Sequence, residues 1–428
     1  MAIGALGAIA SGGPDVIVGS IPAAGTYASV AGVRAYSIAT TSCNIGDEEL
    51  EWFADTNRHP VIAQNLYRLS DGRFEHIGMS WVKHGFGAIQ GNLCGSCIPA
   101  GDFQHLGVGC SDPYTVGLNG NQPGMGPRSE INASTGYFPF PFSSMGFGGD
   151  PVFKRLQVLE ADLAVPDARF FFEGHYVTPD DAAAGNGANN ASWREVRFVT
   201  LNFSPVLMGS TSREEPAMFA WAQADAGVLL DFVDVAGDGR FWIASRAYDN
   251  GDGTYDYEYA VHNLNSHRSA DGFSVPIGAA SASGFGFHDV PYHSGEPYDG
   301  TDWPGAATTG SATWSTDSFS ANPDANALRW GTMYNFRFTS DGPPVQGEAT
   351  ISLFRPGAPG QVTVLAWVPE AAGCAADFNG DGELNFFDVQ DFLEAFSAGD
   401  LAADLTNDGV FDFFDVAAFL DAFSAGCP

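Results

Sequence analysis

Short apolar runs, each broken by glycine, proline, asparagine or aspartate, dominate the chain from Asp15 to Phe203. Examples are DVIVGSI, AGVRAYSIA, QNLYRL, RFEHIGMSWV and REVRFVTLNF. Runs of this length bounded by turn-forming residues are typical of β-strands. We therefore predict a β-rich region here. It is interrupted at VTPDDAAAGNGANNASWREV, where polar and small residues predict an exposed loop.

A second series of such runs extends from Ala217 to Val368. Seven strand candidates follow one another there, namely VLLDFVDV, RFWIASRAY, YDYEYAVHNL, GFSVPIG, NALRWGTMYNFRFTS, EATISLFRP and QVTVLAWVP. Seven short strands separated by turn signals predict a sandwich of the immunoglobulin or fibronectin type. AGDGR and DNGDGT separate neighbouring candidates at hairpin distance. Because Asp-Gly tolerates the positive φ of a tight turn, we interpret both as hairpin turns and not as calcium loops.

The pattern changes after residue 373, where one segment occurs twice. ADFNGDGELNFFDVQDFLEAFSAG begins at Ala376, and ADLTNDGVFDFFDVAAFLDAFSAG begins at Ala403. Each copy contains an apolar stripe at helical spacing, i, i+3, i+4 and i+7. The stripes are Val389, Phe392, Leu393 and Phe396, and Val416, Phe419, Leu420 and Phe423. We predict two loop-helix units whose helices pack face to face.

Oxygen-bearing side chains recur at positions 1, 3, 5, 9 and 12 of each predicted loop, with glycine at position 6. Calcium takes about six to eight oxygen ligands, and this spacing wraps a chain around one ion, with position 7 contributing its backbone carbonyl. The predicted ligands are Asp377, Asn379, Asp381, Glu383, Asn385 and Asp388, and then Asp404, Thr406, Asp408, Val410, Asp412 and Asp415. The sequence therefore predicts two calcium ions. We expect the second to bind less tightly, because Thr406 is a weaker ligand.

The tail, residues 374–428, resembles a dockerin, the calcium module by which exported bacterial proteins attach to a cohesin domain. Its flanking GCAADFNGDG and closing FSAGCP are similar to the GC-type dockerins of exported proteins from planctomycete-like bacteria. The resemblance implies a small α-helical calcium domain and a cohesin-like or other protein partner.

Loop positions 10 and 11 depart from that family. Dockerins of cellulose-degrading complexes often place small polar recognition residues there, whereas this chain has Phe386 and Phe387, then Phe413 and Phe414. Adjacent helical residues lie on different faces. We therefore expect one phenylalanine of each pair to lie in the core and the other to contact the partner.

Together these patterns predict a mainly β protein: a β-rich N-terminal region, an immunoglobulin- or fibronectin-like sandwich, and a small α-helical, dockerin-like calcium domain at the C-terminus. The predicted divisions are a signal remnant or flexible arm at 1–14, a cysteine-containing β domain at 15–205, the sandwich at 206–368, a linker at 369–373 and the calcium domain at 374–428.

Charge and hydropathy narrow the possible partners. The chain has 51 acidic and 18 basic residues, a formal net charge of -33. Nucleic acid would be repelled at long range, so we exclude it as a partner. No run of 18 or more apolar residues occurs, so we expect no membrane span. The start, MAIGALGAIASGG, is similar to the end of a secretory signal.

Six cysteines divide into two groups. Cys43, Cys94, Cys97 and Cys110 lie in the N-terminal region, and Cys374 and Cys427 bracket the tail. An even number in each group indicates disulfides in an exported protein, at the cell surface or outside the cell. We predict that the two cysteines flanking the tail pair with each other. The first four allow three pairings, and a zinc site at CGSC is the alternative.

The body, residues 15–368, resembles uncharacterised exported bacterial proteins through phrases such as HPVIAQNLYRL and YEYAVHNLNS, and this resemblance implies no chemistry. His59, His84 and His105 are candidate ligands for a transition metal. However, HExxH and GxSxG motifs are absent.

We therefore expect a non-catalytic structural or adhesive protein of an extracellular assembly. It would attach to a partner or self-associate, and one form is a filament subunit whose DVIVGSI strand joins a neighbour's sheet. The alternative is an anchored extracellular enzyme or carbohydrate-binding protein, with a transition metal at the three histidines.

Overall fold

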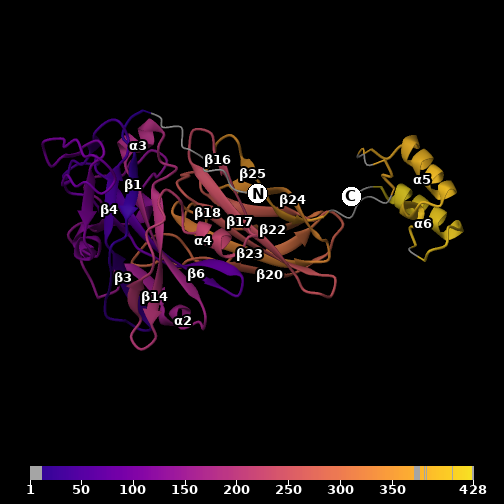
Figure 1. Cartoon of the computed structure of the whole chain (residues 1–428), viewed down its shortest axis with the longest axis horizontal. Helices are drawn as coiled ribbons and strands as arrows, with labels where there is room; N and C mark the ends of the chain where they lie inside the picture. The colour runs from indigo at the N-terminus through magenta and orange to yellow at the C-terminus, as the bar shows by residue number, and fades with distance from the viewer. Residues whose placement is uncertain (1–11, 371–375, 380, 382, 407, 427–428) are drawn as a thin grey trace.

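The computed structural model describes residues 12–370, 376–379, 381, 383–406 and 408–426 (Figure 1). The chain is mainly β, with antiparallel sheets through the body and two helices in the tail. The predicted fold class is therefore confirmed. Most of the predicted N-terminal arm lies outside the described residues.

The N-terminal region is built on one large antiparallel sheet with smaller sheets beside it. In spatial order its strands are β15 (Ser204–Leu207), β14 (Ala191–Val199), β13 (Arg169–Val177), β6 (Val61–Ser70), β7 (Arg73–Met79), β12 (Leu156–Leu159), β3 (Val33–Ile38) and β2 (Ala24–Thr26), with β8 (Val82–His84) pairing β6 and β11 (Met125–Gly126) pairing β8. A second sheet contains β1 (Val16–Ser20), β4 (Thr40–Asn44) and β10 (Ser111–Tyr114), and β5 (Leu50–Glu51) pairs β9 (His105–Leu106).

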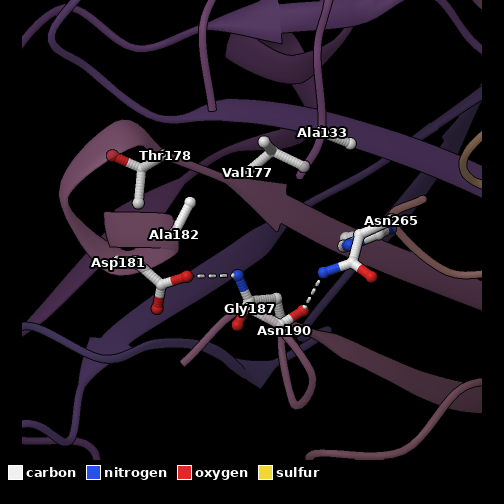
Figure 2. Close-up of a pocket in the computed structure, with 9 residues that line it drawn as sticks. Ala133, Val177, Thr178, Asp181, Ala182, Gly187, Asn190 and Asn265 are labelled. Atoms are coloured by element: carbon white, nitrogen blue, oxygen red, sulfur yellow. Dashed lines mark hydrogen bonds between the residues drawn. The ribbon is translucent and has the colours of Figure 1, made fainter. Parts of the chain in front are cut away.

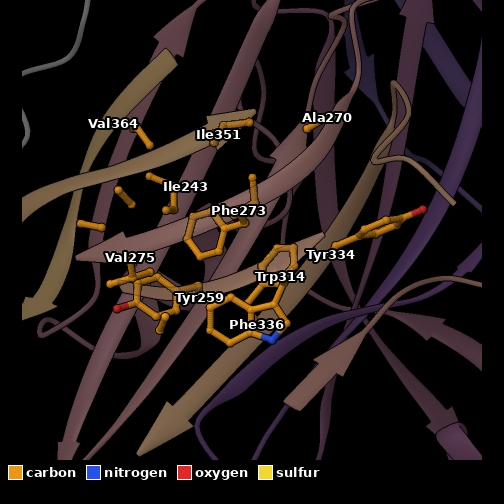
Figure 3. Close-up of a cluster of buried hydrophobic side chains, with 14 of the residues drawn as sticks. Ile243, Tyr259, Ala270, Phe273, Val275, Trp314, Tyr334, Phe336, Ile351 and Val364 are labelled. Atoms are coloured by element: carbon orange, nitrogen blue, oxygen red, sulfur yellow. The ribbon is translucent and has the colours of Figure 1, made fainter. Parts of the chain in front are cut away.

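The C-terminal part of the body is a sandwich of two five-stranded sheets. One contains β16 (Leu229–Asp234), β17 (Arg240–Asp249), β18 (Tyr255–Asn263), β23 (Thr332–Ser340) and β20 (Ala282–His288). The other contains β21 (Gly305–Thr308), β22 (Ser311–Ser315), β19 (Ala270–Pro276), β24 (Pro344–Leu353) and β25 (Gln361–Pro369). Their inner faces share one core, in which Phe273, Trp314 and Phe336 pack together (Figure 3).

Helices are short in the body and longer in the tail. The body has α1 (Val116–Asn119), α2 (Glu160–Leu163), α3 (Pro179–Ala184) and α4 (Phe219–Ala224), with 3₁₀ turns η1 (Gln122–Gly124) and η2 (Arg128–Glu130). The tail has α5 (Phe386–Ala398), the 3₁₀ turn η3 (Leu401–Ala403) and α6 (Phe413–Ala425). Gly399 ends α5 in the left-handed conformation that glycine adopts without strain, at φ 68°.

The seven strands predicted in the sandwich all form, and so do both predicted hairpin turns. AGDGR joins β16 to β17, and DNGDGT joins β17 to β18. Three further strands, β20, β21 and β22, were not predicted. Their sequences ASGFGFH, GAAT and SATWS are rich in glycine, alanine, serine and threonine, so they carry little of the alternating apolar signal that marks a strand.

The sheet formed by β16, β17, β18, β23 and β20 is buried on both faces at its central strands, so the body packs in three layers. Along β17, Phe241 and Ile243 face the sandwich core, whereas Trp242 and Ala244 face a second cluster. Side chains point alternately to the two faces of a strand, which explains this division. The second cluster includes Tyr67, Phe74, Phe171 and Trp193 of the N-terminal region, together with Trp221 of α4. The two parts of the body therefore share an apolar interface.

The segment VTPDDAAAGNGANNASWREV was wrongly predicted to be an exposed loop. It forms α3 and the start of β14. Asp181 is fully buried and accepts a hydrogen bond from the Val16 N–H at 2.9 Å. It also accepts one from Asn190 Nδ2 at 2.9 Å (Figure 2). The error arises because asparagine and aspartate are common in loops, yet here they supply hydrogen bonds to buried backbone.

The DVIVGSI strand is part of its own chain's fold. β1 pairs with β4, and Val16, Ile17 and Val18 are buried. Donating this strand to a neighbouring subunit would expose these side chains and break the β1–β4 hydrogen bonds. β1 is nevertheless an edge strand of the sheet β1-β4-β10, so its pairing with a neighbour's sheet, without donation of the strand, stays a prediction.

Candidate functional site

The first tail loop is closed by hydrogen bonds among the predicted calcium ligands. The N–H of Asp381 donates to Asp377 Oδ1 at 3.1 Å and to Asn379 Oδ1 at 2.8 Å. Asn385 Nδ2 donates to the carbonyl of Glu383 at 3.0 Å. These bonds link loop positions 1, 3 and 5, and separately positions 7 and 9; their calcium ligation stays a prediction. Gly380 and Gly382 lie outside the described residues.

The second loop repeats the first with different side chains. The N–H of Asp408 donates to Asp404 Oδ1 at 3.2 Å, and the N–H of Val410 donates to Asp408 Oδ1 at 2.8 Å. Thr406 Oγ1 donates to Asp415 Oδ1 at 2.9 Å, so its hydroxyl is tied to the carboxylate at position 12. Asn407 lies outside the described residues.

Positions 9 and 12 of each loop also cap the helix that follows. Asn385 and Asp388 form a capping box at the start of α5, and Asp412 and Asp415 form the same box at α6. The carboxylates of Asp388 and Asp415 are buried and accept backbone N–H groups of their own loops. Hydrogen bonds from the backbone N–H of Asn385 and of Asp412, respectively, are the main reason why the pKa of each carboxyl lies below its usual value.

The two tail helices pack through a pair of stacked rings. Phe392 and Phe419 are each 1% exposed, and their ring centroids lie 4.1 Å apart. Phe378, at position 2 of the first loop, packs edge-on against Phe392. The predicted face-to-face packing is present. However, Leu393 and Leu420, which were predicted to be part of the apolar core stripe, are 50% and 53% exposed.

All four phenylalanines at loop positions 10 and 11 lie on the surface. Phe386, Phe387, Phe413 and Phe414 are 72%, 62%, 75% and 66% exposed. The prediction that one of each pair is buried was therefore wrong. These residues open their helices, and helical side chains point back toward the preceding turn. The preceding turn is the calcium-type loop, whose apolar side chains Phe378 and Leu384, and Leu405 and Phe411, pack on the core of the tail instead.

The four N-terminal cysteines form two disulfides, Cys43–Cys94 and Cys97–Cys110. The sequence left the three pairings open, and the structure selects this one, with Cα–Cα distances of 6.0 Å in Cys43–Cys94 and 4.2 Å in Cys97–Cys110. The alternative zinc site is not formed, because all four sulfurs are bonded in pairs. Cys374 and Cys427 lie outside the described residues, so their predicted pairing stays a prediction.

The structure brings two of the three predicted histidine ligands together. His59 Nδ1 donates to the carbonyl of Phe53, which leaves its Nε2 to accept from His84 Nδ1 at 3.0 Å. Burial lowers the pKa of His59 to about 4 and that of His84 well below its usual value, so both rings are neutral. His105 instead contacts the exposed Asp102 at 3.1 Å.

Within the described ranges, no group of three or more His, Cys, Asp or Glu side chains is arranged to hold a metal ion. The three-histidine site is therefore not assembled. In the first tail loop, two of the five predicted side-chain ligands are the amides Asn379 and Asn385. Their side-chain oxygens accept hydrogen bonds from the backbone N–H groups of Asp381 and Phe387. Calcium binding by these loops remains a proposal.

Comparison with known proteins adds little. No protein-family model matches the chain, and no curated protein matches it. A crystal structure of the serine-rich repeat adhesion glycoprotein from Streptococcus agalactiae aligns with 78% of this chain and 88% of its own, at 8% identity and a TM-score of 0.20. An overlap at this TM-score carries no argument about fold or function.

Proposed function

We propose that this chain is an exported, non-catalytic structural or adhesive protein whose tail binds two calcium ions and attaches the body to a protein partner. One observation carries the proposal. Two copies of an oxygen-rich loop each close on themselves, each caps a helix, and each presents two exposed phenylalanines.

Export is supported by the disulfides of the body. Cys43–Cys94 and Cys97–Cys110 use every cysteine of the N-terminal region. Structural disulfides form and persist in oxidising compartments and are rare in reducing ones. No helix among the residues that the structure describes is long and apolar enough to cross a membrane.

The donor set of each loop fits calcium by its chemistry. Carboxylate, amide, hydroxyl and backbone carbonyl oxygens are hard ligands, and neither loop contains a sulfur or an imidazole. In the first loop, Asp377, Asp381 and Asp388 would carry the charge of the site, and Asn379 and Asn385 would add neutral oxygens. When bound, the ion supplies positive charge that offsets repulsion among the carboxylates.

Attachment is supported by the surface of the tail. Large exposed aromatic side chains are frequent anchors of protein–protein interfaces. Exposed Phe pairs at equivalent positions of both copies, with ring centroids 6.3 Å apart in each, give two matching sites of contact. A protein partner is therefore the ligand that this surface fits best.

Calorimetric titration of the intact chain with calcium, after removal of metal, tests the proposal. We expect about two ions per chain for the native protein and about one for Asp377→Ala, because position 1 begins the first ligand set. Glu394→Gln, which removes an exposed carboxylate outside both loops, should still bind two. Fewer than one ion in the native chain would overturn the proposal.

A further inference from the structure

The tail carries an exposed apolar surface that extends beyond the two Phe pairs. On α5, Leu393 lies seven residues after Phe386 and therefore on the same side of the helix. Leu420 stands in the same relation to Phe413 on α6. Each helix thus carries one exposed apolar patch, and we call the two patches together the outer face: Phe386, Phe387 and Leu393 on α5, and Phe413, Phe414 and Leu420 on α6. Six large apolar side chains on so small a module indicate a surface that is covered in use.

Acidic residues border the outer face, and the tail contains no basic residue that could neutralise them. On α5, Asp391 follows Phe387 by one helical turn and Glu394 follows it by two. On α6, Asp421 follows Phe414 by two helical turns, the position equivalent to Glu394. Residues 374–428 contain twelve Asp and Glu and no Lys, Arg or His. Two calcium ions would offset four of these charges. The border of the outer face therefore stays negative with the loops filled.

A second copy of this chain is a poor occupant for that surface. The whole chain has a formal net charge of -33, and two outer faces brought together would place their acidic borders against each other. Like charges juxtaposed across an interface are strongly unfavourable and select against the wrong partner. Charge complementarity instead favours a surface with Arg or Lys around an apolar centre.

We propose that the outer face docks on a different protein, whose binding surface has apolar pockets for the phenylalanines and a rim of arginine or lysine. This inference rests on the proposed attachment function and specifies the chemistry of the partner. The aromatic side chains would supply most of the affinity, and the acidic border would supply selectivity and a fast, salt-dependent encounter.

The experiment uses the full-length chain, immobilised in calcium, to retain proteins from the extracellular fraction of the source cells. Retained proteins are then purified and titrated against three variants. Phe386→Gln combined with Phe413→Gln removes one anchor of each pair. Asp391→Asn, Glu394→Gln and Asp421→Asn together neutralise the border. Leu401→Gln is the matched control, because Leu401 is 76% exposed yet lies in η3, outside the outer face.

We expect the anchor variant to bind a retained protein at least about 30-fold more weakly, and the border variant roughly tenfold more weakly. The control should bind like the native chain. Binding should weaken with added salt for the native chain and less so for the border variant. A retained protein that meets all these criteria supports the proposal, whereas retention alone does not.

Three results would overturn it. One is a partner whose affinity is unchanged in the border variant and insensitive to salt. Another is calcium-dependent self-association in analytical ultracentrifugation that the anchor variant abolishes. The third is failure to retain any protein in an anchor-dependent way. Calcium titration of the same variants separates these outcomes from a failure of the tail to bind calcium. All three variants should still bind about two ions, because none of them changes a predicted ligand.

Discussion

At the scale of single residues, Asp112 shows how burial changes an ordinary carboxyl. It lies in β10 and is 3% exposed. Its Oδ1 accepts the N–H of Ile89 at 2.8 Å, and its Oδ2 has no hydrogen-bond partner within the part of the chain that the structure describes. Burial therefore raises its pKa from 3.8 to about 7. The folded protein holds this group neutral up to neutral pH.

This raised pKa makes stability depend on pH. The unfolded chain releases the Asp112 proton near pH 4, whereas the folded chain keeps it to about 7, so folding is favoured below pH 4 and this contribution is lost as the pH rises through 7. The predicted loss is on the order of 4 kcal/mol. Chemical denaturation across this pH range should show a flatter profile for Asp112→Asn. The control Asp317→Asn, at an exposed site, should keep the native slope.

At this scale the sequence singled out the candidate loop ligands and the four phenylalanines, but it did not predict the exposure of the phenylalanines. Position in the repeat is a property of the sequence. Exposure depends on what packs over a side chain, and the first turn of α5 and α6 faces a polar loop. Phe378 shows the reverse case, since it stands within the polar loop and yet packs on Phe392.

At the scale of elements, the two tail helices depend on one aromatic stack. Phe392 is buried against Phe419, whereas Phe387 is exposed on the same helix. Replacing a buried Phe by Ala typically costs about 3–5 kcal/mol. In the intact chain, Phe392→Ala should abolish hydrogen-exchange protection in α5 and α6 together, and Phe387→Ala should leave it. Loss of protection in α5 alone would show that the helices do not depend on each other.

Strand prediction succeeded where an apolar run is bounded by turn signals, and it had less to work with where that signal is weak or absent. β16, β17 and β18 have clear apolar runs divided by Asp-Gly turns. β13, RFFFEGHYV, lies between β6 and β14 and is buried along nearly its whole length, so it lacks an alternating pattern. The small-residue strands β21 and β22 form because their neighbours offer hydrogen-bonding edges.

At the scale of the whole molecule, a buried arginine joins the two parts of the body. Arg128 donates to the carbonyls of Ser80 and Gln64 in the N-terminal region and to the carbonyl of Gly331 beside β23. Burial lowers its pKa to about 10, so it remains charged at neutral pH. A guanidinium in this position satisfies backbone carbonyls of both parts, which couples their structures.

We predict that the body unfolds in one cooperative transition. Trp221 is 1% exposed and belongs to the cluster that both parts share, so Trp221→Ala should lower the stability of the whole body by about 3–5 kcal/mol. Differential scanning calorimetry of the intact chain should show a single body transition shifted to lower temperature. Leu201→Ala, at a site 94% exposed, is the control. Two body transitions, only one of them shifted, would contradict this coupling.

The sequence by itself determined the β character of the body, the hairpin turns, and the duplicated loops with their candidate ligands, because these depend on local periodicity and on residue spacing. Only the tertiary structure decided which cysteines pair, that His105 stays apart from His59 and His84, and that all four tail phenylalanines are exposed. It also placed Asp181 and Arg128 in the interior. Each of these outcomes depends on which distant segments come into contact, and a linear pattern carries no record of such contacts.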